Sequence, residues 1–289
     1  MTKGFSIVGA GRLGTALAAA LARRGWRPAA LVDRDLGAAR EARRLAGDGR
    51  ASTALGLSPD PGRLVVVAVP DAEVAKAAAA MARSGVDWTG RVVVHTSGLL
   101  TAAVLSPLAR RGARTASCHP VQSFARKDAP ASVFAGVTWG VEGDPEAVEA
   151  CGRVVRSLRG HLLLLAAKDK PLYHAACALA SNAFVALEGT AVDLLVGAGI
   201  DRRTAEAILL PLVEGTLQNV KKLGLEGALT GPVIRGDQST VAAHLEALGP
   251  EPRASEIYRV LGKAVLEMAA RRGLAPSRVR SLRRRLGGG

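Results

Sequence analysis

Up to residue 166, short apolar runs alternate along the chain with segments in which apolar residues recur at the helical period. Short apolar runs such as residues 64–69, Leu-Val-Val-Val-Ala-Val, contain no polar residue, which is typical of a strand covered on both faces. Alanine-rich segments with helical period lie between these runs. Strand and helix therefore alternate, which predicts parallel βαβ units with right-handed crossovers. The predicted strands span residues 5–9, 29–32, 64–69, 92–94, 115–118, 137–141 and 161–165, and the predicted helices 13–24, 36–46, 73–83 and 145–158.

The pattern changes after residue 167, because no further run has the character of a strand. Four later segments have helical period and are separated by glycine-rich turns; they span residues 170–196, 202–222, 238–248 and 253–272. We therefore predict an α/β protein of two domains. Residues 1–167 form a doubly wound parallel sheet, and residues 168–289 form an all-helical domain.

A glycine-rich turn follows the first predicted strand and opens the first predicted helix. In this GxGxxG motif Gly9 permits a tight turn, Gly11 lets the backbone approach a pyrophosphate, and Gly14 lets the helix pack close to the strand. The free N–H groups at the start of that helix then face the phosphates. The motif predicts a dinucleotide site, and the alternative is a glycine turn without a ligand.

Two neighbouring residues at the end of the second strand bear on the choice of dinucleotide. Asp33 is placed to bind ribose hydroxyls, which favours NAD, whereas Arg34 and Arg12 favour the 2′-phosphate of NADP. Arg34 as a solvated surface charge remains an alternative. The residues expected to contact the cofactor are Gly9, Ala10, Gly11, Arg12, Leu13, Gly14, Asp33, Arg34, Val69 and Pro70.

Polar clusters follow the next two strands, at His95-Thr96-Ser97-Gly98 and at residues 119–124, His-Pro-Val-Gln-Ser-Phe. Carboxyl ends of parallel strands meet at one edge of a sheet, so both clusters are expected in one crevice. Ser97 and His119 are candidate catalytic residues. The alternative is that these side chains cap loops and that His95 is a structural histidine.

The first helix of the second domain carries a further polar stripe. Lys170 and His174 are four residues apart and share a helix face, and Asn182 lies about two turns beyond His174. His174 is a candidate proton donor because its ordinary pKa lies near neutrality. Asn182 is expected to be buried, contacting substrate or cofactor, or else bonding to a neighbouring helix. Lys170 is expected to contact the substrate.

An irregular loop at residues 229–237 holds Thr, Arg and Asp between two helices. Arg235 is a candidate anchor for a substrate carboxylate. The alternative is an Arg–Asp pair in which Asp237 caps the next helix.

Composition narrows the function class. The net charge is +14, but aromatic residues make up 3% and do not lie among the arginines, so base-stacking platforms are missing and nucleic acid is not the expected partner. The three cysteines, Cys118, Cys151 and Cys177, form no CxxC pair, which fits a reduced cytoplasmic setting and predicts no metal site. No leader peptide and no long apolar run are apparent, so no membrane span is expected.

Six motifs together resemble the Rossmann-like family that carries a domain of unknown function, DUF2520. They are GAGRLG (9–14), AVPD (68–71), HTSG (95–98), HPVQSF (119–124), YHAACALASN (173–182) and LTGPVIRGD (229–237). The resemblance spans about residues 4–270, and the DUF2520-like region is expected to start within residues 119–140. This family is similar in plan to pyrroline-5-carboxylate reductases, ketopantoate reductases and β-hydroxyacid dehydrogenases.

The resemblance implies NADP or NAD as cofactor, with NADP favoured, and a homodimer formed through the C-terminal helices. Related dehydrogenases carry a Lys followed one turn later by an Asn, whereas here Lys170 is followed by His174. This departure shifts the expected proton-handling role toward His174 and Asn182.

The sequence therefore predicts an NAD(P)-dependent oxidoreductase that transfers a hydride to or from a small carbonyl or imine, with a 2-keto acid such as ketopantoate as one candidate. The alternative is a non-catalytic NAD(P)-binding sensor or regulatory protein.

Overall fold

The computed structural model describes residues 4–53 and 60–287. The chain divides into two compact units between Ser181 and Asn182, and each unit is described by itself. The domain boundary predicted after residue 167 lies earlier in the chain than this division, just after the last strand ends at Leu164.

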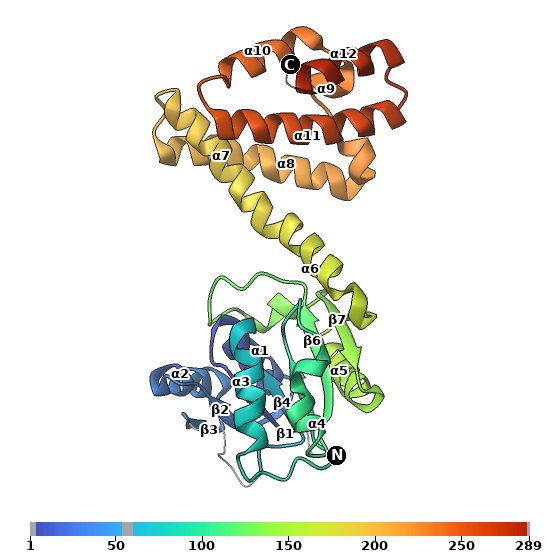
Figure 1. The fold of residues 1–289 in the computed structure, drawn as a ribbon. Helices are drawn as coiled ribbons and strands as arrows, with labels where there is room; N and C mark the ends of the chain where they lie inside the picture. The colour runs from blue at the N-terminus through green and yellow to red at the C-terminus, as the bar shows by residue number, and fades with distance from the viewer. Residues whose placement is uncertain (1–3, 54–59, 288–289) are drawn as a thin grey trace. The chain divides into compact units, whose positions relative to one another are not determined.

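The first unit is built on one sheet (Figure 1), which has eight strands within the described residues, in the order β3-β2-β1-β4-β5-β6-β7-β8. The order reverses at β1, which pairs with both β2 and β4, so a crevice opens at the carboxyl ends of β1 and β4. The strands are β1 (Gly4–Val8), β2 (Arg27–Val32), β3 (Arg50–Ser52), β4 (Leu64–Val67), β5 (Val92–His95), β6 (Arg114–Pro120), β7 (Thr138–Gly143) and β8 (His161–Leu164).

Helices cover both faces of this sheet because successive strand residues point to opposite sides. Ile7 and Val66 belong to the core beneath α1, α2 and α5, whereas Val8 and Val67 belong to the core beneath α3 and α4. The helices of this unit are α1 (Arg12–Arg23), α2 (Leu36–Ala46), α3 (Asp71–Ala82), α4 (Ser106–Ala109), α5 (Pro145–Ser157) and α6 (Lys170–Ala178), with 3₁₀ turns η1 (Ala102–Leu105), η2 (Ala131–Phe134) and η3 (Ala167–Asp169). The predicted doubly wound α/β fold is confirmed.

One strand departs from the predicted parallel arrangement. β7 runs antiparallel to β6, while the other pairs in the sheet are parallel. A parallel connection needs a crossover of a dozen or more residues, usually an α-helix. Between β6 and β7 the chain forms only the short η2, so it returns beside β6 in the opposite direction. The short edge strand β3 was not predicted.

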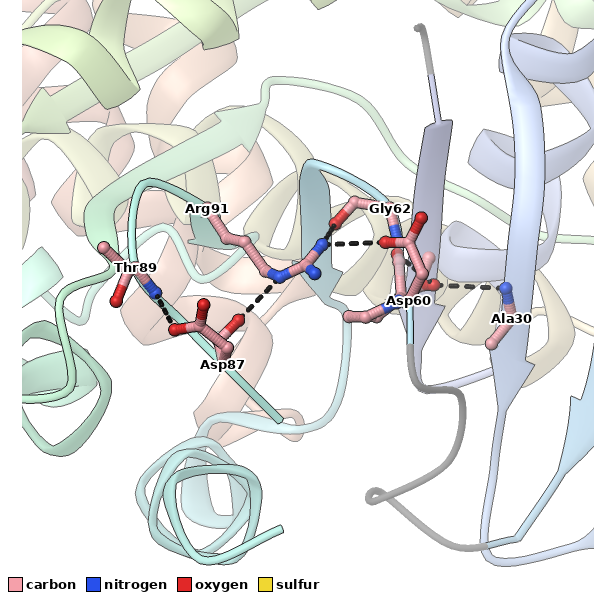
Figure 2. A network of polar contacts seen from close by, with 8 residues as sticks. Ala30, Asp60, Gly62, Asp87, Thr89 and Arg91 are labelled. Atoms are coloured by element: carbon pink, nitrogen blue, oxygen red, sulfur yellow. Dashed lines mark hydrogen bonds and ion pairs between the residues drawn. The ribbon is translucent and has the colours of Figure 1, made fainter. Parts of the chain in front are cut away.

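The amino edge of the sheet is held by the side chain of Arg91, just before β5 (Figure 2). Its Nη1 donates to the Gly62 carbonyl at 2.6 Å and to Asp60 Oδ1 at 2.9 Å, and its Nε donates to the Asp87 carbonyl at 2.7 Å. The guanidinium lowers the pKa of Asp60 below its ordinary value. These bonds fix the loops that enter β4 and β5, far from the carboxyl edge.

The second unit is helical, as predicted. Its core is small and gathers residues such as Val241, Leu266 and Leu282. Helix α12 (Pro276–Gly287) was not predicted, because its few hydrophobic residues lie among arginines. The elements are η4, a π turn (Leu179–Ala183) that crosses the unit boundary, then α7 (Phe184–Gly197), α8 (Arg202–Ala228, kinked at Gly224), α9 (Pro232–Arg235), α10 (Gln238–Ala247), α11 (Pro252–Arg271) and α12 (Pro276–Gly287).

One long helical stretch leaves much apolar surface uncovered within the single chain. Among the described residues, Ala167–Gly197 is the segment long and apolar enough to cross a membrane by length and composition, and only 6% of its apolar window is buried. A single such helix is weak evidence for a membrane span. The stretch is not an unbroken apolar run, because polar residues such as Asn182, Glu188 and Asp193 interrupt it.

Candidate functional site

The glycine turn after β1 depends on close backbone contacts. Gly9 has a φ of 102°, and its N–H donates to the Val32 carbonyl at 2.7 Å. A Cβ on Gly9 would press against the Ala68 carbonyl at the end of β4, and a Cβ on Gly14 would overlap the Gly9 carbonyl. The turn therefore requires glycine at both positions.

The start of helix α1 is open. Gly11 occupies the N-cap, no side chain caps the helix, and its first turn contains no acidic residue. A Cβ placed on Gly11 would meet nothing within 4 Å. A helix start with no side-chain cap, open space at Gly11 and no acidic residue in its own first turn fits an anionic diphosphate.

Asp33 ties the end of β2 to this turn. Its Oδ2 accepts the Ala10 N–H at 2.7 Å, and its Oδ1 accepts the Asp35 N–H at 3.0 Å. The carboxylate lies at the predicted place and organises the backbone there, so one lone pair on each oxygen is committed to protein.

A pocket of about 320 Å³ lies beside the turn. It is lined by Asp33, Arg34, Val69 and Pro70, four of the residues predicted to contact a cofactor, together with Glu73, Lys76, Ala77 and Ala80 from α3. Apolar walls with a few charged groups at the rim suit an adenosine. Arg12 is exposed on α1 and Leu13 is partly buried against the core; neither lines this pocket.

The first histidine of the second cluster is structural. His95 is fully buried at the end of β5, its Nδ1 accepts the Ser97 N–H at 3.2 Å, and its Nε2 lies 3.1 Å from the Thr101 carbonyl. Burial lowers the pKa of His95 to about 4, so the ring is neutral and Nε2 carries the proton that it donates to Thr101.

The Ser97 hydroxyl is already fully bonded. It donates to Asp71 Oδ2 at 2.8 Å and accepts the N–H groups of Leu99 and Leu100 at 3.2 and 2.9 Å. Asp71, the first residue of α3, is therefore the partner of Ser97. Ser97 shapes the turn that follows β5.

Lys170, the first residue of α6, is fully buried beneath this turn. Its Nζ donates to the Ser117 hydroxyl at 2.6 Å and to the Ser97 carbonyl at 3.2 Å. Burial lowers the pKa of Lys170, while the carboxylates of Glu142 and Asp71 act in the opposite direction. The ammonium group thus points into the protein and holds the start of α6 against the sheet.

One turn further along α6, two side chains meet His119. The Tyr173 hydroxyl lies 2.9 Å from His119 Nδ1, and the His174 ring stands edge-on to His119 with centroids 5.8 Å apart. Burial, with His174 and Lys170 nearby, lowers the pKa of His119 to about 4, and burial raises the pKa of Tyr173 to about 12. The geometry depends on Gly98, because a Cβ there would overlap the His174 ring and lie 3.0 Å from His119 Nε2.

The two parts of the site meet at the start of α3. Pro70 lines the pocket, and the adjoining Asp71 accepts the hydroxyl of Ser97, whose neighbour Gly98 touches the histidines. The pocket and the histidine cluster are thus connected along one edge of the sheet.

Two predicted site residues belong to the second unit. Asn182 is exposed, which corrects the expectation that it is buried, because the apolar surface around it is not covered within one chain. Arg235 is exposed at the end of α9. Asp237 caps α10 by accepting the Thr240 N–H at 3.0 Å, as the alternative reading had it, and no Arg235–Asp237 ion pair forms among the described residues.

Some residues of the site escaped sequence reasoning. Glu73 and Lys76 lie on a helix whose charges resemble an ordinary solvated face, and Ser117 and Glu142 lie inside strands. The only signal for Tyr173 was its place beside His174. Among the described residues no cluster of His, Cys, Asp or Glu forms a metal site.

Two family models match successive parts of the chain. Residues 3–120 match the model of the Rossmann-like domain, and residues 137–265 match the domain of unknown function DUF2520. Both matches confirm the resemblance that the six motifs indicated. No curated protein matches the sequence.

Several solved structures share the fold over nearly the whole chain. The putative NADP oxidoreductase BF3122 from Bacteroides fragilis is 23% identical, with 91% of this chain and 98% of that chain covered and a TM-score of 0.76. Protein TM1727 from Thermotoga maritima is 26% identical over 93% and 99%, with a TM-score of 0.74. A reductive aminase from Aspergillus terreus, solved with NADPH and ethyl levulinate, is 18% identical over 94% and 95%, with a TM-score of 0.62.

Proposed function

We propose that this chain, which joins a Rossmann-like domain to a DUF2520 domain, is an NAD(P)-dependent oxidoreductase acting on a small carbonyl or imine. One observation carries the proposal: the open start of α1 and its pocket connect through Pro70 and Asp71 to a cluster of two histidines and a tyrosine. When bound, the nicotinamide supplies or accepts the hydride. The similar structures named for NADP and NADPH support this reading.

His119 is proposed to orient the substrate. We assign the Tyr173 hydroxyl as the donor to His119 Nδ1, and with this assignment the neutral ring carries its proton on Nε2. That N–H is free to donate to a carbonyl oxygen or an imine nitrogen beside Gly98. His174, half-buried and also beside Gly98, is the proposed carrier of the proton that reduction consumes.

The 2′-phosphate of NADP has candidate partners at the pocket. Arg34 and Lys76 both line it, and both carry charges that a phosphate recognises. We therefore propose NADP as the preferred cofactor, and a 2-keto acid such as ketopantoate as the first substrate to test.

The exposed helices suggest a second copy of the chain as a partner. Leu172 is 77% exposed and Leu179 is 70% exposed on one continuous helical stretch. Lipid is a poor cover for this stretch, since Glu188 and Asp193 lie within it and carboxylates in hydrocarbon are costly. We propose a homodimer through these helices, and sedimentation as a monomer would overturn it.

The test of the proposed function uses the full chain in two steps. Thermal unfolding is first measured with and without NADPH and NADH, and we expect a higher Tm with at least one of them. Oxidation of the bound reduced cofactor is then followed over 2-keto acids, aldehydes and cyclic imines. Turnover supports an oxidoreductase, binding without turnover favours a sensor, and binding of neither nucleotide overturns the proposal.

A further inference from the structure

Three charged side chains stand together at the rim of the cofactor pocket. Arg34 follows β2, whereas Glu73 and Lys76 lie in the first turns of α3, and all three line the pocket that Asp33 and Val32 also line. Their arrangement places one carboxylate between two cations. Lys76 Nζ donates to Glu73 Oε1 at 3.1 Å, and Arg34 Nη1 lies 3.5 Å from Glu73 Oε2.

The carboxylate is the most sheltered member of this trio. The Glu73 side chain is 29% exposed, against 85% for Arg34 and 75% for Lys76. Lys76 first and Arg34 second lower the pKa of Glu73, so it remains charged near neutrality. The trio thus carries a net charge of one positive unit, although two cations are present.

We infer that Glu73 sets the preference between NADPH and NADH by competing with the 2′-phosphate for Arg34 and Lys76. The inference rests on the proposed function. It assigns a specificity role to two α3 residues that lie outside the glycine motif.

The competition follows from charge. A phosphate monoester carries between one and two negative charges near neutrality and binds cations more strongly than a carboxylate does. Exposed ion pairs such as those of Glu73 are weak and rearrange easily. A 2′-phosphate at this rim therefore draws both cations from Glu73, and leaves that carboxylate without its partners. NADH has no phosphate and leaves the trio as it is.

Asp33 does not perform this discrimination by itself. Both of its oxygens already accept backbone N–H groups. Arg34 and Lys76 are the cations that line this pocket, and Glu73 is the carboxylate that pairs with both.

The experiment measures dissociation constants of NADPH and NADH by nucleotide fluorescence, with no turnover needed. Glu73→Gln keeps the shape of the side chain and releases both cations. We expect NADPH to bind roughly 3–5-fold more tightly and NADH to change by less than about twofold, as the loss of an exposed ion pair allows. Lys76→Met should weaken NADPH binding by about tenfold and leave NADH nearly unchanged, as loss of a charge-assisted phosphate contact does.

Combining the variants tests the competition itself. If Glu73 acts by occupying Lys76, the gain from Glu73→Gln shrinks in the Lys76→Met background, because the two effects are not additive. Glu73→Ala serves as a second variant and should shift the ratio in the same direction as Glu73→Gln.

Matched controls remove equal charge elsewhere. Arg83→Met takes a cation from the exposed end of the same helix, and Glu149→Gln takes a carboxylate from α5, where it pairs with Arg153. Both should leave the NADPH-to-NADH ratio as in the wild type. If the wild-type chain binds both nucleotides but the Glu73 and Lys76 variants behave like these controls, the inference is overturned and the proposed function stands. If the wild type binds neither nucleotide, both are overturned.

Discussion

The candidate site has a first half, the glycine turn with its pocket, and a second half, the histidine cluster. One glycine in each half is constrained by its neighbours, and the kind of neighbour differs. Gly14 packs against the backbone of the turn at Gly9, whereas Gly98 packs against the rings of His119 and His174. The first half is therefore a backbone structure, determined by local turn chemistry. The second half is built from side chains that come from separate elements. A site built from backbone requires glycines at a fixed spacing, which can be recognised in the sequence. A site built from side chains of separate elements requires no fixed spacing.

The largest expected effect comes from a substitution that disrupts the second half alone. His119→Ala removes the N–H proposed to orient the substrate and should lower turnover by about 10²–10⁴-fold, the usual range for a positioned acid–base group. Affinity for NADPH should stay within a few-fold of the wild type. Unchanged turnover in steady-state kinetics would remove His119 from the reaction.

The next largest effect comes from a substitution that disrupts the first half. Gly14→Ala places a methyl group on the Gly9 carbonyl, where neither backbone can yield. Overpacking of this kind costs up to about 3 kcal/mol, so nucleotide affinity should fall by up to roughly 100-fold. Fluorescence titration measures it, and circular dichroism confirms that the chain is folded. Wild-type affinity in a folded Gly14→Ala chain would show that the turn does not hold the dinucleotide.

A smaller effect concerns His95, the structural histidine. The pKa of His95 is about 4 when folded and about 6.5 when unfolded, so the unfolded chain binds more protons between these values. The contribution of His95 to the free energy of unfolding is therefore fully present above pH 6.5 and is lost as the pH drops toward 4. Between pH 7 and pH 5, His95 should account for a loss of about 2 kcal/mol in urea denaturation.

The control for this pH effect is His95→Asn, whose amide oxygen can still accept the Ser97 N–H. This variant should lose less stability between pH 7 and pH 5 than the wild type does. His119 contributes in the same direction, so part of the pH dependence should remain. Identical pH profiles for the two proteins would contradict the burial argument.

The smallest effect sharpens the contrast between the two glycines. Gly98→Ala meets side-chain rings, which can shift more easily than backbone. We expect turnover to fall by about tenfold, because strain of about 1–2 kcal/mol displaces the histidines, while nucleotide affinity remains. Loss of NADPH binding together with turnover would mean that the two halves are not separable.

Sequence reasoning located the first half well for this reason. The alternation of strand and helix, and the glycines at 9, 11 and 14, are set by local chemistry that any chain with this turn must satisfy. The same holds for Asp33 at the end of β2, although its bond to Ala10 could not be foreseen.

The second half was only partly foreseen. The clusters at residues 95–98 and 119–124 were expected in one crevice, but the pairing of His119 with Tyr173 and the burial of Lys170 depend on how α6 lies across the sheet. The antiparallel β7 was missed because periodicity reports burial and not direction. Tertiary placement decides such features, and a single sequence contains no local trace of it.

The helix that bears Tyr173 and His174 has one further consequence. Lys170 fixes its first residue inside the sheet, and the same helical stretch runs on through the π turn into α7. Tyr173 and His174 therefore lie about one helical turn from the residue that anchors this stretch, so a change at Lys170 reaches both rings through the helix backbone.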